Sequence, residues 1–104
     1  MSPNAPMRLV LSRRAAADLE EIGDYIAQDN PLRATTFVEE LASHCERLTR
    51  YPDIGTARPE LGEGLRVMPH GRYLIFYRPR DGALRIERIL HSARDVTGDA
   101  FGAA

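Results

Sequence analysis

Two segments in the first half of the chain carry apolar residues at the spacing of an α-helix. The first runs from Arg13 to about Asp29, and its apolar positions are Ala15, Leu19, Ile22 and Ile26. The second runs from Pro31 to Arg50, and its apolar positions are Ala34, Phe37, Val38, Leu41, Ala42, Cys45 and Leu48. Residues three or four apart share one face of a helix. Asn30 and Pro31 are typical of a helix cap and a first turn, so the pattern predicts two antiparallel helices joined by a short connection.

The second half of the chain carries short runs of β-branched, aromatic and aliphatic residues separated by glycine and proline. Together with a short apolar run near the start, they predict strands at residues 7–11, 65–69, 72–79 and 83–91. Asp81-Gly82 is typical of a type I′ hairpin turn, in which both central residues adopt positive φ. Residues 52–64 are predicted to form a loop. The order β-α-α-β-β-β predicts an α+β fold, in which an N-terminal strand and an antiparallel helical hairpin pack on a small antiparallel β-sheet.

A chain of 104 residues is expected to form a single domain, residues 1–104. We expect an ordered core from about residue 7 to residue 96, with flexible ends. The tail from Thr97 to Ala104 is small and polar and is expected to fray.

The strand predicted at residues 72–79 is apolar on both faces. Its side chains Tyr73, Ile75 and Tyr77 would point one way, and those of Leu74 and Phe76 the other way. A strand of this kind needs cover on both sides. We expect the chain to be too short to supply two covering layers, so a second protein is expected to cover one face.

Charge and composition exclude several classes of protein. The formal net charge is −1 and the isoelectric point is about 6.3, so the chain has no overall basic footprint for nucleic acid. All fourteen basic residues are arginine, and seven of them lie between residues 66 and 94. A single cysteine excludes an internal disulfide and fits a reducing compartment. The N-terminus lacks a signal-peptide pattern and no apolar run is long enough to span a bilayer, so we expect a cytoplasmic protein.

Four segments, in order along the chain, resemble a known family. The first is residues 17–26, which read Ala-Asp-Leu-Glu-Glu-Ile-Gly-Asp-Tyr-Ile. The second is Pro31-x-x-Ala34, and the third is Leu48-x-x-Tyr51-Pro52-x-x-Gly55 with Leu65-Arg66 after it. The fourth combines residues 73–78, which read Tyr-Leu-Ile-Phe-Tyr-Arg, with residues 89–95, which read Ile-Leu-His-Ser-Ala-Arg-Asp. At these spacings, from about Leu9 to Asp95, the chain resembles the ParE-type toxins of the ParE/RelE superfamily. These proteins are the toxic halves of type II toxin–antitoxin, or plasmid stabilisation, modules.

The resemblance implies a fold, a partner and an activity. The fold would be a helical hairpin on a small antiparallel sheet, and the partner would be a cognate ParD-like antitoxin. Such antitoxins carry a ribbon-helix-helix end that binds DNA and an acidic, apolar C-terminal segment that wraps the toxin. Operator DNA would therefore be contacted only through the antitoxin. ParE-type members are associated with inhibition of DNA gyrase, whereas RelE-type members cut mRNA on the ribosome.

The matched segments favour a toxin that inhibits DNA gyrase by binding, without enzymatic activity and without a cofactor. Two alternatives stay open. One is a ribosome-dependent mRNA interferase of the RelE type. The other is a protein that has lost toxicity and serves as an antitoxin-binding, autoregulatory module.

We expect the antitoxin to contact the helical hairpin, the strand that is apolar on both faces, and part of the arginine cluster. Its apolar groups would fill a groove or add a strand, and its acidic residues would meet the arginines. The candidate antitoxin-binding residues are Leu19, Ile22, Tyr25, Ile26, Phe37, Arg66, Tyr73, Ile75, Tyr77, Arg78 and Arg88.

A metal-free ribonuclease needs a general base, a general acid and cations close together. For that alternative the catalytic candidates are Arg66, Arg78 and His91. Arg78 and Arg88 could share a face of the sheet, but His91 has the opposite parity from Arg88 within its strand. We therefore expect no catalytic site here, and we expect His91 to be a hydrogen-bonded structural residue.

The remaining candidate residues have structural interpretations. His44 is expected on the solvated side of the second helix, and His70 is expected in a turn without a role. The three histidines lack the spacing of metal ligands, so no metal site is expected. Cys45 falls in the apolar stripe and is expected in the core. The acidic positions of the first helix are expected to form a solvated face; they include Asp18, Glu21 and Asp24.

Overall fold

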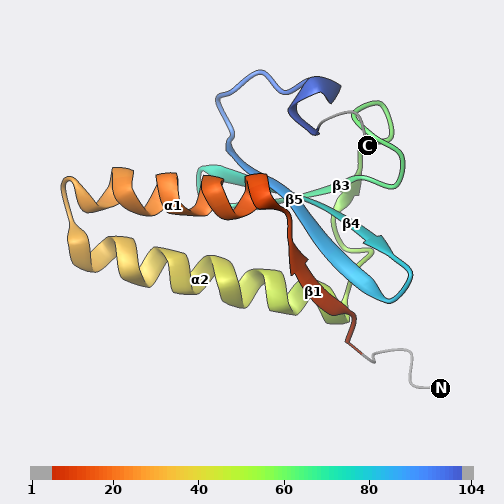
Figure 1. Ribbon diagram of the computed structural model, residues 1–104, viewed down its shortest axis with the longest axis horizontal. Coiled ribbons are helices and arrows are strands. Elements are labelled where there is room, and N and C mark those ends of the chain that lie inside the picture. The colour runs from red at the N-terminus through yellow and green to blue at the C-terminus, as the bar shows by residue number, and fades with distance from the viewer. Residues whose placement is uncertain (1–5, 102–104) are drawn as a thin grey trace.

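Two helices cover one face of a mixed β-sheet in the computed structural model, which describes residues 6–101 (Figure 1). The elements of this part of the chain are β1 (Arg8–Leu11), α1 (Arg13–Ala27), α2 (Pro31–Arg50), β2 (Thr56–Ala57), β3 (Arg66–His70), β4 (Tyr73–Arg80), β5 (Ala83–His91) and the 3-10 helix η1 (Gly98–Phe101). Within the described residues the strands form one five-stranded sheet in the order β1-β5-β4-β3-β2. The loop end of the helical hairpin projects beyond the sheet (Figure 1).

The α+β fold and the helical hairpin are confirmed, and the sheet differs from the prediction in two places. First, β1 runs parallel to β5, so the sheet is mixed and not purely antiparallel. Along the sequence, α1 and α2 separate β1 from the other strands. No tight hairpin therefore forces β1 into the antiparallel direction. Second, the predicted loop at 52–64 contains the short strand β2, which pairs with β3.

Local signals set the boundaries of the helices and of the last hairpin. The Ser12 side chain caps α1 by accepting a hydrogen bond from the Ala15 N–H at 2.9 Å, and Asn30 caps α2 in the same way. Asp81 and Gly82 have φ values of 52° and 78°. Both central residues of the β4–β5 turn therefore adopt the positive φ that a type I′ turn requires.

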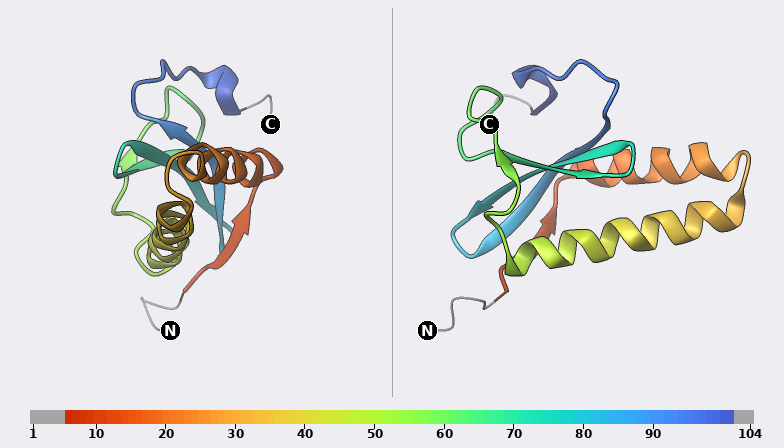
Figure 2. Two further views of the ribbon diagram at one scale, coloured as in Figure 1. Left: turned by 90° about the vertical axis from the view of Figure 1, so that its left-hand side faces the viewer. Right: turned by 180° about the vertical axis from the view of Figure 1, so that it is seen from behind.

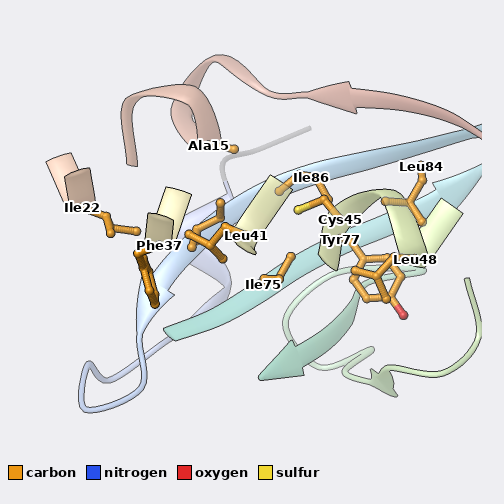
Figure 3. Packing of buried hydrophobic residues seen from close by; sticks show 11 residues of the cluster. Ala15, Ile22, Phe37, Leu41, Cys45, Leu48, Ile75, Tyr77, Leu84 and Ile86 are labelled. Atoms are coloured by element: carbon orange, nitrogen blue, oxygen red, sulfur yellow. The ribbon is translucent and has the colours of Figure 1, made fainter. Parts of the chain in front are cut away.

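The main core lies between the helical hairpin and the sheet (Figure 3). Its buried residues are Ala15, Ile22, Phe37, Leu41, Cys45, Leu48, Ile75, Tyr77, Leu84, Ile86 and Ile89. Cys45 lies in this core as predicted, and burial raises the pKa of its thiol to about 11. The Tyr77 hydroxyl donates to the Pro52 carbonyl and accepts from the Gly55 N–H. A Cβ at Gly55 would collide with the Tyr77 ring, so the loop after α2 needs glycine at this position.

The apolar part of the second face of the sheet is covered by the chain itself, so the expectation that a partner must cover it is wrong. A second cluster of buried residues consists of Leu65, Val67, Phe76, Leu90 and Phe101. The loop before β3 and the segment after β5 supply the cover and lie side by side over this face (Figure 2). Phe101 packs against Phe76 with ring centroids 4.9 Å apart. The expectation that the tail frays is therefore wrong as far as Phe101, and residues 102–104 lie outside the described part of the chain.

A β-bulge interrupts the alternation of side chains in β5. Phe76 pairs with Arg88, but the next residue, Tyr77, pairs with Ile86, so Glu87 is an extra residue in β5. Because of this extra residue, Ile86 and Ile89 face the same core although they are three positions apart. Strict alternation along the strand could not predict this arrangement.

Where β1 ends, side chains at the start of α1 take over the hydrogen bonding to the backbone of β5. The Ser12 hydroxyl donates to the Glu87 carbonyl at 2.7 Å, and the Asp18 carboxylate accepts the Ile89 N–H at 3.0 Å. The same carboxylate accepts two hydrogen bonds from Arg88, at 2.7 and 2.8 Å. Arg88 also donates to the Ala100 carbonyl at 2.9 Å. Asp18 thus joins α1, β5 and the C-terminal segment.

The burial of Asp18 contradicts the prediction of a solvated acidic face at this position. Asp18 and Arg88 are 6% and 7% exposed, and the hydrogen bond that Arg88 donates to Asp18 raises the pKa of Arg88. The carboxylate faces the open edge of β5 beyond β1, where an unpaired strand N–H needs an acceptor. Glu21 and Asp24 are exposed, as predicted.

Replacing Asp18 should destabilise the fold strongly. Asp18→Asn leaves the buried Arg88 guanidinium without its counter-charge, so we expect a loss of about 3 kcal/mol in the free energy of unfolding. Urea denaturation followed by circular dichroism measures this loss. The control Asp24→Asn changes an exposed carboxylate on the same helix and should stay within about 0.5 kcal/mol of the parent. Equal stability of the two variants would contradict the inference that Asp18 holds α1, β5 and the C-terminal segment together.

Replacing Phe101 should show whether the tail is part of the core. Phe101→Ala removes the ring that packs on Phe76, and we expect a loss of about 2 kcal/mol, less than at a central site because a chain end can relax. The same urea denaturation measures it. Thr97→Ala, an exposed change in the same segment, serves as the control. A Phe101→Ala variant as stable as this control would mean that the tail does not cover the sheet.

Candidate functional site

A groove of about 600 Å³ opens where the loop end of the helical hairpin meets the sheet. Its walls come from the end of α1, the start of α2, the β3–β4 turn, the start of β4 and the end of β5. We call it the aromatic groove, and its lining residues are Tyr25, Ile26, Arg33, Phe37, Gly71, Arg72, Tyr73 and His91.

The aromatic groove combines ring surfaces with cations. Tyr25 is 69% exposed and offers a large apolar side chain to a partner. The Tyr73 ring lies 5.6 Å from that of Phe37 and 5.3 Å from that of His91, and the Arg33 guanidinium lies 5.2 Å from the Phe37 ring. Burial, and then the neighbouring Tyr25 hydroxyl, raise the pKa of Tyr73, so this phenol stays neutral at physiological pH. The groove suits aromatic or aliphatic anchors with acidic groups nearby.

Two histidines meet beside the groove, and neither has the environment predicted for it. The Nδ1 atoms of His44 and His70 are 2.8 Å apart, and the His70 ring packs edge-on against Phe37. One Nδ1 must therefore donate to the other, which is impossible when both rings carry a proton there. Burial, followed by the positive charges of His70 and Arg47, lowers the pKa of His44. His44 is thus partly buried against His70 and not simply solvated, and His70 contacts both His44 and Phe37.

A second groove, of about 420 Å³, lies at the turn end of the β4–β5 hairpin. We call it the basic groove; its lining residues are Arg8, Val10, Arg78, Arg80, Asp81, Ala83, Arg85 and Glu87. The Glu87 carboxylate lies within the groove and accepts from Arg78 at 2.5 Å and from Arg85 at 3.2 Å. Four guanidinium groups therefore meet two carboxylates, which leaves the groove with an excess of positive charge.

The structure divides the eleven candidate antitoxin-binding residues. Four of them line the aromatic groove: Tyr25, Ile26, Phe37 and Tyr73. Leu19 lines a small apolar opening between the helices and β1, and Arg78 lines the basic groove. Ile22, Ile75 and Tyr77 are buried in the main core and line none of these three openings.

All three candidate arginines are engaged within the chain. Arg78 donates to the Glu63 carbonyl and to the Glu87 carboxylate, and the other two also have partners. Arg88 is buried against Asp18, so its guanidinium is not available to acidic residues of a partner, contrary to the expectation. Arg66 donates to the carbonyls of Asp53 and Gly55 and holds the loop after α2. All three side chains therefore have structural contacts, and the sequence could not distinguish them from surface arginines.

The three catalytic candidates are not brought together. Arg66 pairs with Tyr77, whose side chain faces the helices, whereas Arg78 is the next residue in β4 and points to the other face. His91 pairs with Tyr73 at the far end of β4, which is five residue steps, on the order of 16 Å, from Arg78. His91 accepts a hydrogen bond from the Ala93 N–H, as expected of a structural residue.

Sequence reasoning missed Arg8 and Val10, which line the basic groove. The alternation of side chains along β1 could have identified them, because Arg8 and Val10 share one face of the strand and Leu9 and Leu11 share the other. Within residues 6–101 no helix is long and apolar enough to cross a membrane. In the same range no three His, Cys, Asp or Glu side chains are arranged to hold a metal ion.

Comparisons with known proteins agree on one family. The model of the family described as ParE toxin of type II toxin–antitoxin system, parDE, matches residues 9–96. A curated relative from Caulobacter vibrioides, Toxin RelE2, is 38% identical over 87 residues, which cover 84% of this chain and 97% of the relative. Toxin ParE1 of Mycobacterium tuberculosis is 34% identical over 91 residues, which cover 86% of this chain and 93% of the relative.

Solved structures show the same fold. The chromosomal ParDE TA system from P. aeruginosa contains a chain that superposes with a TM-score of 0.72 at 26% identity, over 86% of this chain and 98% of that one. A chain of the toxin–antitoxin complex RelBE2 from Mycobacterium tuberculosis superposes with a TM-score of 0.63 at 23% identity, over 84% and 99% of the two chains. The second match supports the fold alone.

The histidine pair should make stability depend on pH. The folded-state pKa of His44 lies below the unfolded value of about 6.5, so the unfolded chain binds more protons as the pH falls below that value. The contribution of His44 is therefore full above about pH 6.5 and is lost toward lower pH. We expect the urea midpoint to fall between about pH 7.5 and about pH 5.5, and to fall less in His44→Asn. His91→Asn should keep the parental slope; an unchanged slope in His44→Asn would contradict the prediction.

Proposed function

This chain belongs to the family of ParE toxins of type II toxin–antitoxin systems, and we propose that it inhibits DNA gyrase by binding when no antitoxin holds it. The partner that neutralises it is a ParD-like antitoxin with a ribbon-helix-helix end and an acidic, apolar C-terminal segment. Operator DNA is contacted through that antitoxin. The main support is the aromatic groove, a partly open apolar surface rimmed by arginines, which is suited to binding a protein segment.

Action by binding, without catalysis, is part of the same proposal. A ribonuclease would need its base, acid and cations around one phosphate. The separation of Arg66, Arg78 and His91 over both faces and both ends of the sheet gives them no common substrate position. This distribution supports a toxin that acts through its surface.

One observation favours the RelE-type alternative, an mRNA interferase. The basic groove presents Arg8, Arg80 and Arg85 on an exposed face, and such a surface can hold a phosphate backbone. One of the relatives is also named RelE2. The antitoxin-binding module without toxicity is distinguished from both by growth, since its overexpression alone would leave growth unchanged.

A supercoiling assay tests the target. Purified protein added to gyrase and relaxed plasmid should block supercoiling, and the protein encoded by the neighbouring reading frame should restore it. In parallel, mRNA translated in a purified system should stay intact. Supercoiling that proceeds normally while mRNA is cut would contradict the gyrase proposal and favour the interferase; in that case Arg78→Ala should stop the cutting.

Replacing Tyr25 should weaken antitoxin binding. Tyr25→Ala removes the exposed ring of the aromatic groove, and we expect the dissociation constant to rise about tenfold or more, as for an aromatic anchor. Biolayer interferometry with the neighbouring-frame protein measures it. Tyr51→Ala is the matched control, because Tyr51 is 46% exposed but does not line the groove. Equal affinities of the two variants would exclude the aromatic groove as the docking site.

A further inference from the structure

The β-bulge in β5 places an extra carboxylate between two arginines. Arg78 of β4 pairs directly with Arg85 of β5, so their side chains share one face of the sheet. Glu87, the extra residue of the bulge, accepts from Arg78 at 2.5 Å and from Arg85 at 3.2 Å. These two hydrogen bonds go to different oxygens of the carboxylate, so each oxygen has a guanidinium donor of its own.

Glu87 and Arg78 are held in place by their surroundings. Their side chains are 10% and 16% exposed, whereas that of Arg85 is 51% exposed. The Nε of Arg78 also donates to the Glu63 carbonyl at 2.7 Å. Like charges directly opposite each other on neighbouring strands repel, and the carboxylate between them offsets this repulsion. The arginine pair therefore forms an anion-binding site that a side chain of the same protein occupies.

Without this carboxylate, the same groups have the chemistry of a phosphate site. The planar guanidinium group matches the oxygens of a carboxylate and of a phosphate equally well. The basic groove surrounds the pair with a volume of about 420 Å³, and Arg8 and Arg80 lie exposed along it. Four cations in one groove could follow the successive phosphates of a nucleic-acid strand. With Glu87 in place, a phosphate would meet a buried negative charge and would have to displace an existing ion pair.

We propose that Glu87 is a specificity-determining residue that keeps phosphate groups, and with them RNA, out of the basic groove. Its carboxylate takes the position that a phosphate would need between Arg78 and Arg85. Arg8 and Arg80 stay exposed, so single carboxylates of a protein partner can still find a cation there. The consequence for the target rests on the function proposed above, because a toxin whose basic groove rejects RNA is directed to a protein target.

Neutralising Glu87 tests the proposal. Glu87→Gln keeps the shape of the side chain and removes its charge, so Arg78 and Arg85 become available to a phosphate. We expect the variant to bind a short labelled single-stranded RNA about tenfold or more tightly than the unaltered protein, with a steeper dependence on salt. Fluorescence anisotropy at several salt concentrations measures both quantities. Equal affinities of the folded variant and the unaltered protein would overturn the proposal.

Two controls separate the position of the charge from its sign. Asp81→Asn removes another carboxylate of the basic groove, but this side chain is 91% exposed, and asparagine tolerates the positive φ of the turn. Glu63→Gln removes an exposed carboxylate that does not line the groove. Because water and salt screen exposed charges, each control should change the RNA affinity by less than about threefold. A gain as large as that of Glu87→Gln in either control would show that net charge decides, and the proposal would be wrong.

A double variant locates the added binding. Arg85→Gln combined with Glu87→Gln removes one of the two guanidinium groups that the carboxylate held. Most of the affinity gained by Glu87→Gln should then be lost. RNA affinity that persists in the double variant would place the RNA elsewhere on the surface and would overturn the proposal.

The unaltered protein offers a test that needs no variant. The Nε–H groups of Arg78 and Arg85 donate to the Glu63 carbonyl and the Glu87 carboxylate. When inorganic pyrophosphate is added, the NMR signals of these two groups should stay in place, whether or not that of the exposed Arg80 shifts. Shifts at Arg78 and Arg85 as large as that at Arg80 would show that Glu87 does not exclude the anion. This measurement decides if thermal unfolding shows that Glu87→Gln does not fold.

The possible results separate this inference from the proposed function. If Glu87→Gln gains RNA affinity but the unaltered protein does not block supercoiling, the gyrase proposal fails and the role of Glu87 stands. If supercoiling is blocked but Glu87→Gln gains no RNA affinity, the role of Glu87 fails and the gyrase proposal stands. If the unaltered protein binds RNA as tightly as the variant and cuts mRNA, both fail.

Discussion

One buried carboxylate holds the three parts of this molecule together. Asp18 accepts hydrogen bonds from the Arg88 side chain and from the Ile89 N–H, and Arg88 in turn binds the Ala100 carbonyl. Removing a charge of this kind from water is costly unless every lone pair finds a donor. The contact therefore specifies where α1 lies along β5, and it also directs the C-terminal segment toward the second face of the sheet.

The result is a sheet whose apolar clusters on both faces are covered by its own chain. The helical hairpin buries one side, and the loop before β3 and the segment ending at Phe101 bury the other (Figures 2 and 3). A partner therefore has no bare apolar sheet face to cover. The surfaces left for it are the aromatic groove at the hairpin end and the basic groove at the opposite end of β4.

These surfaces have a common chemistry. Each combines apolar groups with nearby arginines, and the chain contains no lysine. Arginine binds carboxylates through two parallel hydrogen bonds and stays charged when partly buried. An antitoxin that reached from the aromatic groove to the basic groove would contact both ends of the sheet. Any acidic residues of the proposed antitoxin would find a cation at each end, although the formal net charge of the chain is only −1.

The sequence by itself determined the features that depend on near neighbours. The helical spacing, the caps at Ser12 and Asn30 and the Asp81-Gly82 turn all act over a few residues, and the ordered motifs identified the family. Tertiary structure decided the rest. The Asp18–Arg88 pair spans 70 positions, the His44–His70 contact spans 26, and the bulge at Glu87 exchanges the faces of β5. No local rule links residues so far apart, because their partners are set only when the helices and the tail pack on the sheet.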